Sequence, residues 1–182
     1  ALNADLVRVP RLPELRHPVL GNLYVRELRL WRNPELPRML IAAPALFTED
    51  LADSLWDAGI ATWNWSVNAM SREELMIAAE QLQPQGVVCV NHINGLAEAC
   101  EELGLPMLEW EVDPSTEALA PATRPVPKTR IFTYRKSHVS TFEKAGFQAS
   151  YMPLAANPAR RHPVELTPSE REQFGAELCF VG

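Results

Sequence analysis

Gly86-Val87-Val88-Cys89-Val90-Asn91 is the clearest predicted strand of the chain. Its first five positions carry no polar side chain, so both faces of the strand would be apolar. A strand of this kind lies in the centre of a parallel sheet that is covered by helices. We therefore expect residues 86–91 to form the middle of an α/β sheet.

Helical patterns flank this strand on both sides. Ser71 followed by Glu74 is a capping box, and the apolar residues after it repeat at helical spacing until Pro84. On the other side, an apolar stripe begins at Leu96 and ends at Gly104. The order helix–strand–helix with short connections is typical of α/β domains.

The same alternation continues in both directions along the chain. The first predicted helix follows Thr48, which is expected to be its N-cap. The alternation of strands and helices repeats about five times, which predicts a Rossmann-like, doubly wound and mostly parallel sheet. We expect three α/β/α layers in a single domain. The predicted strands are residues 39–43, 60–65, 86–91, 107–112, 130–134 and 147–152.

Three parts of the chain differ in composition. Residues 1–38 contain five prolines and are predicted to be an N-terminal extension, packed on the domain or acting as a linker, with a short strand or hairpin between Leu20 and Trp31. Residues 39–178 form the predicted Rossmann-like domain. Residues 179–182 (Cys179-Phe180-Val181-Gly182) are predicted to be the first strand of a missing C-terminal domain, and the alternative is a frayed apolar tail.

Composition excludes several classes of protein. The 182 residues are 47% hydrophobic and 22% charged, as in an ordinary globular domain. The formal net charge of −6 disfavours nonspecific nucleic-acid binding, which needs a basic face, and the apolar runs are too short to cross a membrane. Cys89, Cys100 and Cys179 lack metal-ligand spacing, so we expect reduced, buried thiols of a cytoplasmic protein, with no metal or cofactor.

Ligands of doubly wound sheets bind beyond the carboxyl ends of the strands. The segment after the first strand, Pro44-Ala45-Leu46-Phe47, contains no glycine, and no phosphate-binding loop of the G-x-x-x-x-G-K type occurs in the chain. Because glycine lets the backbone approach a pyrophosphate, this argues against an ordinary NAD- or FAD-binding domain. Phe47 is a candidate for ligand contact at this end.

The end of the third strand carries a cluster of hydrogen-bonding side chains. Asn91, His92 and Asn94 lie within four residues and precede Gly95. His92 is predicted to contact a ligand or to act as a base, and the other three are candidates for ligand binding. The alternative is that Asn94 caps the following helix and His92 lies on the surface.

Two later strand ends also carry candidates. Asp113 precedes a proline, which would place its carboxylate, with Ser115 beside it, at the mouth of a cleft; the alternative is an Asx turn. Tyr134 and Arg135 precede the N-terminus of a predicted helix, where backbone N–H groups and a cation favour an anion. The alternative there is a capped helix with solvated cations.

Several short motifs follow one another in a fixed order. Together they resemble the spore-maturation CgeB-like family of glycosyltransferase-like proteins over roughly residues 39–182. The motifs are the segment 86–94, Glu109-Trp110-Glu111-Val112-Asp113-Pro114, Ile131-Phe132-Thr133-Tyr134, Phe142-Glu143-Lys144-Ala145-Gly146-Phe147, Tyr151-Met152-Pro153-Leu154-Ala155-Ala156-Asn157-Pro158 and Cys179-Phe180-Val181-Gly182.

The resemblance implies a GT-B architecture, in which two Rossmann-like domains face each other across a cleft. This chain would be the acceptor-side half, inactive alone, and a nucleotide sugar would bind mainly to the other half. His92 and Asp113 are then candidates for the base that deprotonates an acceptor hydroxyl, and Arg135 for a phosphate contact. The family often shows two acidic residues where this sequence has the single Asp113 before its proline. The second hypothesis is a non-catalytic α/β ligand-binding or interaction module.

Overall fold

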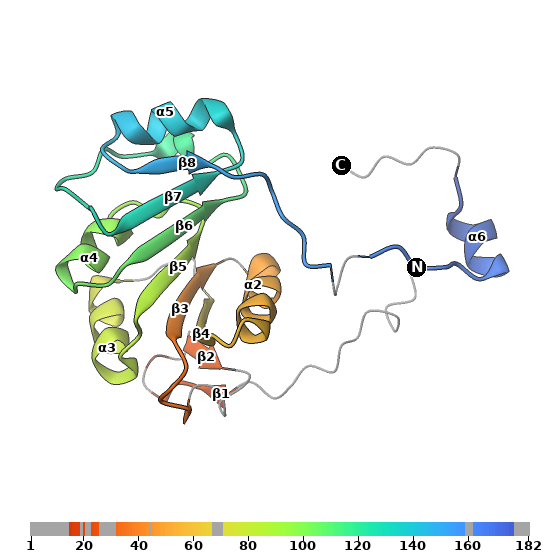
Figure 1. Cartoon of the computed structure of the whole chain (residues 1–182), viewed down its shortest axis with the longest axis horizontal. Coiled ribbons are helices and arrows are strands. Elements are labelled where there is room, and N and C mark those ends of the chain that lie inside the picture. Colours follow the sequence, from red (N-terminus) through yellow and green to blue (C-terminus); the bar gives the residue numbers. More distant parts are fainter. Residues whose placement is uncertain are drawn as a thin grey trace.

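The computed structural model describes residues 15–18, 20, 23–25, 32–43, 45–66, 71–158 and 162–176. An eight-stranded sheet, with strand order β1-β2-β4-β3-β5-β6-β7-β8, is its main element (Figure 1). The strands are β1 (Leu15–Arg16), β2 (Leu23–Val25), β3 (Arg38–Ala43), β4 (Ala61–Ser66), β5 (Gly86–Val90), β6 (Met107–Glu111), β7 (Thr129–Thr133) and β8 (Ala149–Tyr151). The helices are α2 (Ala45–Asp57), α3 (Arg72–Leu82), α4 (Leu96–Glu102), the 3₁₀ turn η2 (Thr116–Ala118), α5 (Lys136–Lys144) and α6 (Pro168–Phe174).

Six of these strands, from β4 to β8 across the sheet, are mutually parallel. They coincide with the six predicted strands to within one or two residues at each end. β2 pairs antiparallel with the outer edge of β4, and β1 pairs antiparallel with β2. The predicted Rossmann-like, mostly parallel α/β fold in a single domain is therefore confirmed.

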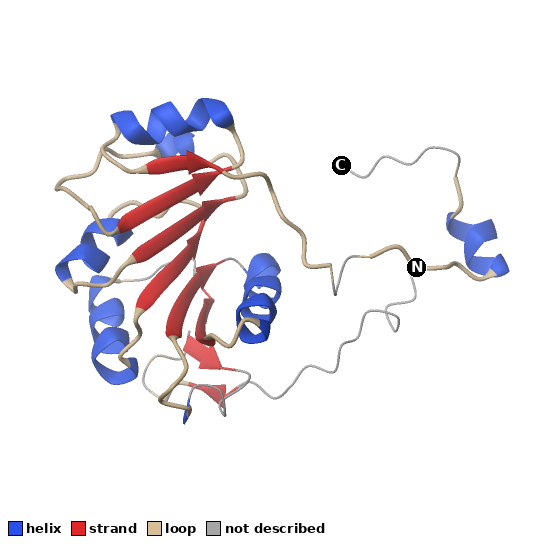
Figure 2. Cartoon of the chain, in the orientation of Figure 1, coloured by secondary structure: helices blue, strands red, loops and turns tan. Residues whose placement is uncertain are grey.

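The helices form a layer on each face of the sheet, and the two layers differ in extent. α3, α4 and α5 cover one face, whereas α2 is the one helix of the described residues on the other, beside β3 and β4 (Figures 1 and 2). β5 is buried at every position, as its apolar sequence predicts. Val87 and Cys89 join the core under α3–α5, and Val90 joins the smaller core under α2.

Of the two predicted helix starts, that of α3 is confirmed and that of α2 is wrong. Ser71 caps α3, and its side chain and that of Glu74 form the predicted reciprocal capping box. α2, in contrast, begins at Ala45, so the prediction that Thr48 is its N-cap is wrong. Thr48 is buried inside the helix, where its Oγ1 donates to the carbonyl of Ala43 at 3.1 Å, so a backbone acceptor satisfies the hydroxyl.

A proline-rich loop with one 3₁₀ turn, η2, connects β6 to β7 in place of a crossover helix. Asn94, in the segment after β5, holds this loop by two hydrogen bonds. Its Nδ2 donates to the carbonyl of Ala118 at 2.8 Å, and its Oδ1 accepts from the N–H of Ala120 at 2.9 Å. The loop is thus tied to the edge of the sheet although the 3₁₀ turn is the only regular element within it.

The chain after β8 runs away from the sheet and ends its described part in α6 (Figure 1). Thr167 and Glu170 form a capping box at the start of α6, but no residue of this helix is buried. The predicted strand at residues 179–182 lies outside the described residues. Among the residues that the structure describes, no helix is long and apolar enough to cross a membrane.

Candidate functional site

The carboxyl ends of the parallel strands meet along one edge of the sheet. The chain passes from β3 to β4 on one side and from β4 back to β5 on the other, so the strand order reverses between β3 and β5. Doubly wound folds bind ligands in the crevice at such an edge. The segments that follow β5, β6 and β7 here carry all but one of the predicted site residues.

Asn91 and Asp113 are brought together at this edge. Oδ1 of Asn91 accepts from the N–H groups of Val112 and Asp113, both at 2.9 Å, and its Nδ2 donates to Oδ2 of Asp113 at 3.1 Å. Asn91 has a φ of 63°, a left-handed conformation that asparagine adopts more readily than most residues. Asn91 therefore joins the ends of β5 and β6, and it holds the exposed Asp113 carboxylate at the rim.

Asn94 and Gly95 lie farther along the same segment and serve the backbone. Both polar groups of the Asn94 amide bind the proline-rich loop, as described above. Gly95, and not Asn94, occupies the N-cap position of α4, with a φ of 83° that favours glycine. The structure thus assigns these two residues contacts within the fold.

His92 points into the protein and not toward the edge. Its Nδ1 lies 2.8 Å from Oε2 of Glu109, and the two side chains are 3% and 0% exposed. The rings of Phe142 and Phe147 lie 5.9 Å and 5.1 Å from the imidazole, centroid to centroid. Nε2 of His92 and Oε1 of Glu109 are buried and have no hydrogen-bond partner among the described residues.

Burial controls the charges around this pair. It raises the pKa of Glu109; the hydrogen bond and charge of His92 offset only part of this effect, and the charge of Glu111 adds to it. Burial also raises the pKa of Cys89 well above its ordinary value, with a contribution from Glu109, and raises that of Cys100 to about 12. Both thiols are free, buried and therefore protonated, which makes them unreactive.

A second histidine–glutamate pair lies nearer the edge. Nδ1 of His138, in the first turn of α5, lies 3.0 Å from Oε1 and 3.3 Å from Oε2 of Glu111. Glu111 also accepts hydrogen bonds from the hydroxyl of Thr133 and from the N–H and hydroxyl of Ser115, the latter two at 3.2 Å and 3.3 Å. Ser115, a predicted site residue, is thus part of the cradle around this carboxylate.

These donors keep Glu111 ionised. Burial would raise the pKa of Glu111, but the hydrogen bonds from Thr133, His138 and Ser115 and the charge of His138 outweigh it and lower the pKa. A carboxylate can only accept, so Nδ1 of His138 must be the donor. In the neutral imidazole, Nε2 then carries the lone pair and is able to accept a proton.

Nε2 of His138 and Nε2 of His92 have different surroundings. The His138 side chain is 14% exposed, whereas that of His92 is 3% exposed and its Nε2 is buried. A carboxylate-oriented imidazole with an accessible Nε2 is a general base, provided that a substrate proton comes within hydrogen-bond distance. His138 and Glu111 therefore form the arrangement with the clearest chemical capacity at this edge.

Tyr134 and Arg135 lie next to this pair, and Phe47 lies elsewhere. Nε of Arg135 donates to Oη of Tyr134 at 2.8 Å, and the exposed guanidinium lies 5.1 Å from the centre of the Tyr134 ring. The N–H of Arg135 donates to Oγ1 of Thr133 at 3.1 Å. Phe47 extends from α2 on the opposite face of the sheet, where its ring contacts that of Trp110 at 6.4 Å.

Sequence reasoning did not select Glu109, Glu111, Thr133 or His138. A signal for the two glutamates is present, since both occupy the inward face of a strand whose other inward residue, Met107, is apolar. Buried carboxylates are almost always paired, so two of them on one strand face indicate two partners. Their identity requires the fold, because His92 and His138 are 17 and 27 residues away from Glu109 and Glu111 respectively.

No cluster of three metal-binding side chains occurs in the described parts of the chain. Comparison of the sequence with known proteins gives no matching family model and no matching curated protein.

Proposed function

We propose that this chain is the acceptor-side half of a GT-B glycosyltransferase, with His138 as the base that deprotonates the acceptor hydroxyl. The observation that carries the proposal is the Glu111–His138 pair at the carboxyl edge of a Rossmann-like sheet. The motif order noted in the sequence supports the same assignment. A nucleotide sugar would bind mainly to a second domain, and this half alone would be inactive.

In the proposed step, His138 accepts one proton and the sugar passes from the nucleotide to the acceptor. Nε2 of His138 takes the proton of the acceptor hydroxyl while the hydroxyl oxygen bonds to the anomeric carbon of the donor sugar. The bond between that carbon and the diphosphate breaks, and its electron pair leaves with the nucleotide. Glu111 holds the imidazole in the required tautomer and stabilises the positive charge that it gains.

Two predicted residues receive narrower roles in this proposal. His92 is enclosed by Phe142 and Phe147 and would not touch the acceptor. Asp113 is exposed at the rim and would accept hydrogen bonds from other hydroxyls of the acceptor. The exposed Arg135 would face the donor diphosphate across the cleft.

The alternative, a non-catalytic α/β ligand-binding or interaction module, is supported by a different observation. Asn91, Asn94 and Ser115 use their polar groups within the fold, on Asp113, the proline-rich loop and Glu111 respectively. A pure scaffold would need these contacts and nothing more. The two hypotheses differ in whether a hydroxyl compound approaches His138.

Nuclear magnetic resonance of the isotope-labelled chain separates them. Methyl glycosides of common hexoses, titrated to tens of millimolar, are expected to shift the His138 Cε1–H and Asp113 amide signals in a saturable way. His138→Gln should abolish the saturable shift, whereas His162→Gln, in the exposed tail, should not. Two results would overturn the proposal in favour of the non-catalytic module. The first is saturable binding elsewhere that His138→Gln leaves unchanged, and the second is no binding at all.

A further inference from the structure

The two faces of the sheet are covered to different extents over β6 and β7. Toward α3–α5, Glu109 and Ile131 are almost fully buried. On the other face, α2 packs mainly on β3 and β4 and reaches β6 through the contact of Phe47 with Trp110, and Leu108 is 37% exposed (Figure 1). We call this second surface the open face and define it by Leu108, Trp110, Arg130 and Phe132.

The open face is apolar with one cation. Trp110 and Phe132 lie opposite each other on β6 and β7, and both are half-buried; Leu108 lies opposite Arg130. Nε1 of Trp110 is buried and has no hydrogen-bond partner among the described residues. The Arg130 guanidinium donates only to the carbonyls of Pro127 and Thr129, and it forms no ion pair with a described carboxylate.

The tail of the chain has the complementary composition. Of the seven exposed large hydrophobic side chains in the described residues, four belong to the segment after β8, and they are Leu154, Val164, Leu166 and Phe174. Residues 162–176 also carry three glutamates against one arginine, so the segment is acidic. α6 within it has a complete capping box but buries nothing, although a helix this short is marginal without packing.

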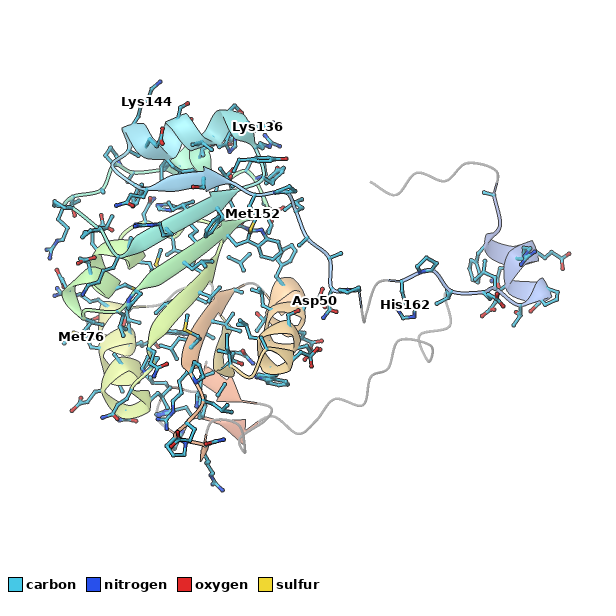
Figure 3. The ribbon with its side chains drawn as sticks, viewed as in Figure 1. Asp50, Met76, Lys136, Lys144, Met152 and His162 are labelled. Atoms are coloured by element: carbon cyan, nitrogen blue, oxygen red, sulfur yellow. The ribbon has the colours of Figure 1, made fainter. Side chains whose placement is uncertain are left out.

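The attachment point favours contact between the two surfaces. Met152 still pairs with β7 through its N–H, and beyond it the tail runs toward the side of the sheet on which α2 lies (Figures 1 and 3). Ten residues lie between Pro153 and Val164, and the eleven Cα–Cα steps span about 35–40 Å when extended, whereas two strands span only about 10 Å. A tether of this length gives a high effective concentration of the tail at the open face.

We propose that the open face is the docking site for the chain's own C-terminal segment, residues 162–176. Val164 and Leu166 are two residues apart, so in an extended segment both side chains point the same way, toward Leu108 and Phe132. The acidic residues of the segment neutralise Arg130. Docking would complete the second outer layer of the fold over β6 and β7.

Disulfide trapping in the full chain tests this placement. Leu108→Cys with Val164→Cys, in a Cys179→Ser background, is expected to form an intramolecular disulfide in dilute solution. Met76→Cys with Val164→Cys is the control, because Met76 is even more exposed than Leu108 but lies on α3, beyond the other face (Figure 3). We expect the Leu108 pair to close at least tenfold faster, as measured by mass spectrometry of unreduced peptides.

A second measurement does not depend on disulfide geometry. Leu108→Cys alone is labelled with a thiol reagent, and Val164→Asp with Leu166→Asp is expected to increase its labelling rate several-fold. Ser169→Asp with Gln173→Asp adds the same charge outside the apolar pair and should change the rate much less. Equal closure of the two cysteine pairs, disulfide-linked dimers only, or a labelling rate unaffected by the tail would each overturn the proposal.

Discussion

Two histidine–glutamate pairs share strand β6, and they differ in the donors around the carboxylate. Glu109 and Glu111 are both fully buried, and each is bound to Nδ1 of a histidine. Glu109 has His92 as its hydrogen-bond partner, and its Oε1 has none in the described chain. Glu111 is bound by His138, Thr133 and Ser115.

The comparison teaches that hydrogen bonding, and not burial alone, decides the charge of a buried carboxyl. Glu109 lies deep in the core with one partner, and its pKa is raised; Glu111 lies nearer the edge of the sheet with several partners, and its pKa is lowered. The inner pair is therefore a costly structural contact, because burial of its charges is poorly compensated. The outer pair holds an ionised carboxylate against Nδ1 of His138, which is the arrangement that the proposed base requires.

The largest expected effect comes from breaking the inner pair. His92→Ala leaves Glu109 buried without its partner and opens a cavity beside Phe142 and Phe147. Loss of one partner of a buried pair costs about 3–5 kcal/mol. We expect a decrease of this size in the free energy of unfolding, measured with urea at pH 7.

A matched double variant sharpens this prediction. His92→Leu with Glu109→Met replaces the pair by apolar groups of similar volume, and it should recover most of the stability that His92→Ala loses. A cost below about 1 kcal/mol for His92→Ala would contradict our account, because that is the range of an exposed pair.

Chemical reactivity tests the accessible nitrogen of each pair. Diethyl pyrocarbonate acylates the free Nε2 of neutral imidazole, so His138 should react and His92 should react only after local opening. Because each 1.4 kcal/mol of opening free energy slows a reaction about tenfold, we expect His92 to react at least tenfold more slowly than His138. Peptide mass spectrometry measures both rates, with the exposed His162 as reference.

Equal rates for His92 and His138 would remove the distinction on which the proposed base depends. If both histidines react slowly while His162 reacts normally, Nε2 of His138 is shielded, and the distinction between the two pairs is lost as well.

The fold was predictable because its signals are local. β5 was recognisable from five consecutive positions without a polar side chain, and α3 from its capping box. The predicted start of α2 is wrong. Thr48 lies inside the helix, where its hydroxyl donates to the carbonyl of Ala43, so it does not need to be an N-cap. Threonine is favoured at N-caps because its hydroxyl forms hydrogen bonds with nearby backbone groups. Inside a helix, a backbone carbonyl can satisfy the same hydroxyl.

The candidate site was only partly predictable, because its contacts are not local. Sequence position places Asn91 and Asp113 at neighbouring strand ends, and the structure joins them directly. No pattern shows that His92 turns inward while His138 lies near the edge. That difference depends on how α5 packs against β7 and β8, which brings Phe142 over His92 and His138 over Glu111.

Removal of one donor from the outer pair has a smaller effect. Thr133→Val keeps the shape of the side chain but deletes a hydrogen bond to Glu111, while His138 and Ser115 remain. A hydrogen bond to a charged group contributes about 1.5–3 kcal/mol, and we expect a loss near the lower end. Thr129→Val is the matched control: Thr129 is buried on the same face of β7 but pairs with Met107, and the control should cost less than Thr133→Val.

The smallest effect, and the most specific, is an opposite pH dependence of the two carboxyls. The folded pKa of Glu111 lies below the ordinary 4.5, so its contribution to stability is complete above that value and is lost as the pH falls. The folded pKa of Glu109 lies above 4.5, so its contribution is complete below that value and is lost as the pH rises through the folded pKa.

Urea unfolding of Glu111→Gln and Glu109→Gln between pH 3 and 6 measures the two contributions separately. The stability of the wild type minus that of Glu111→Gln should rise with pH below about 4.5, whereas the same difference for Glu109→Gln should fall with pH above about 4.5. If both differences change in the same direction, the donors around Glu111 do not govern its charge. Its pairing with His138 would then resemble that of Glu109 with His92, and the outer pair would no longer support the proposed base.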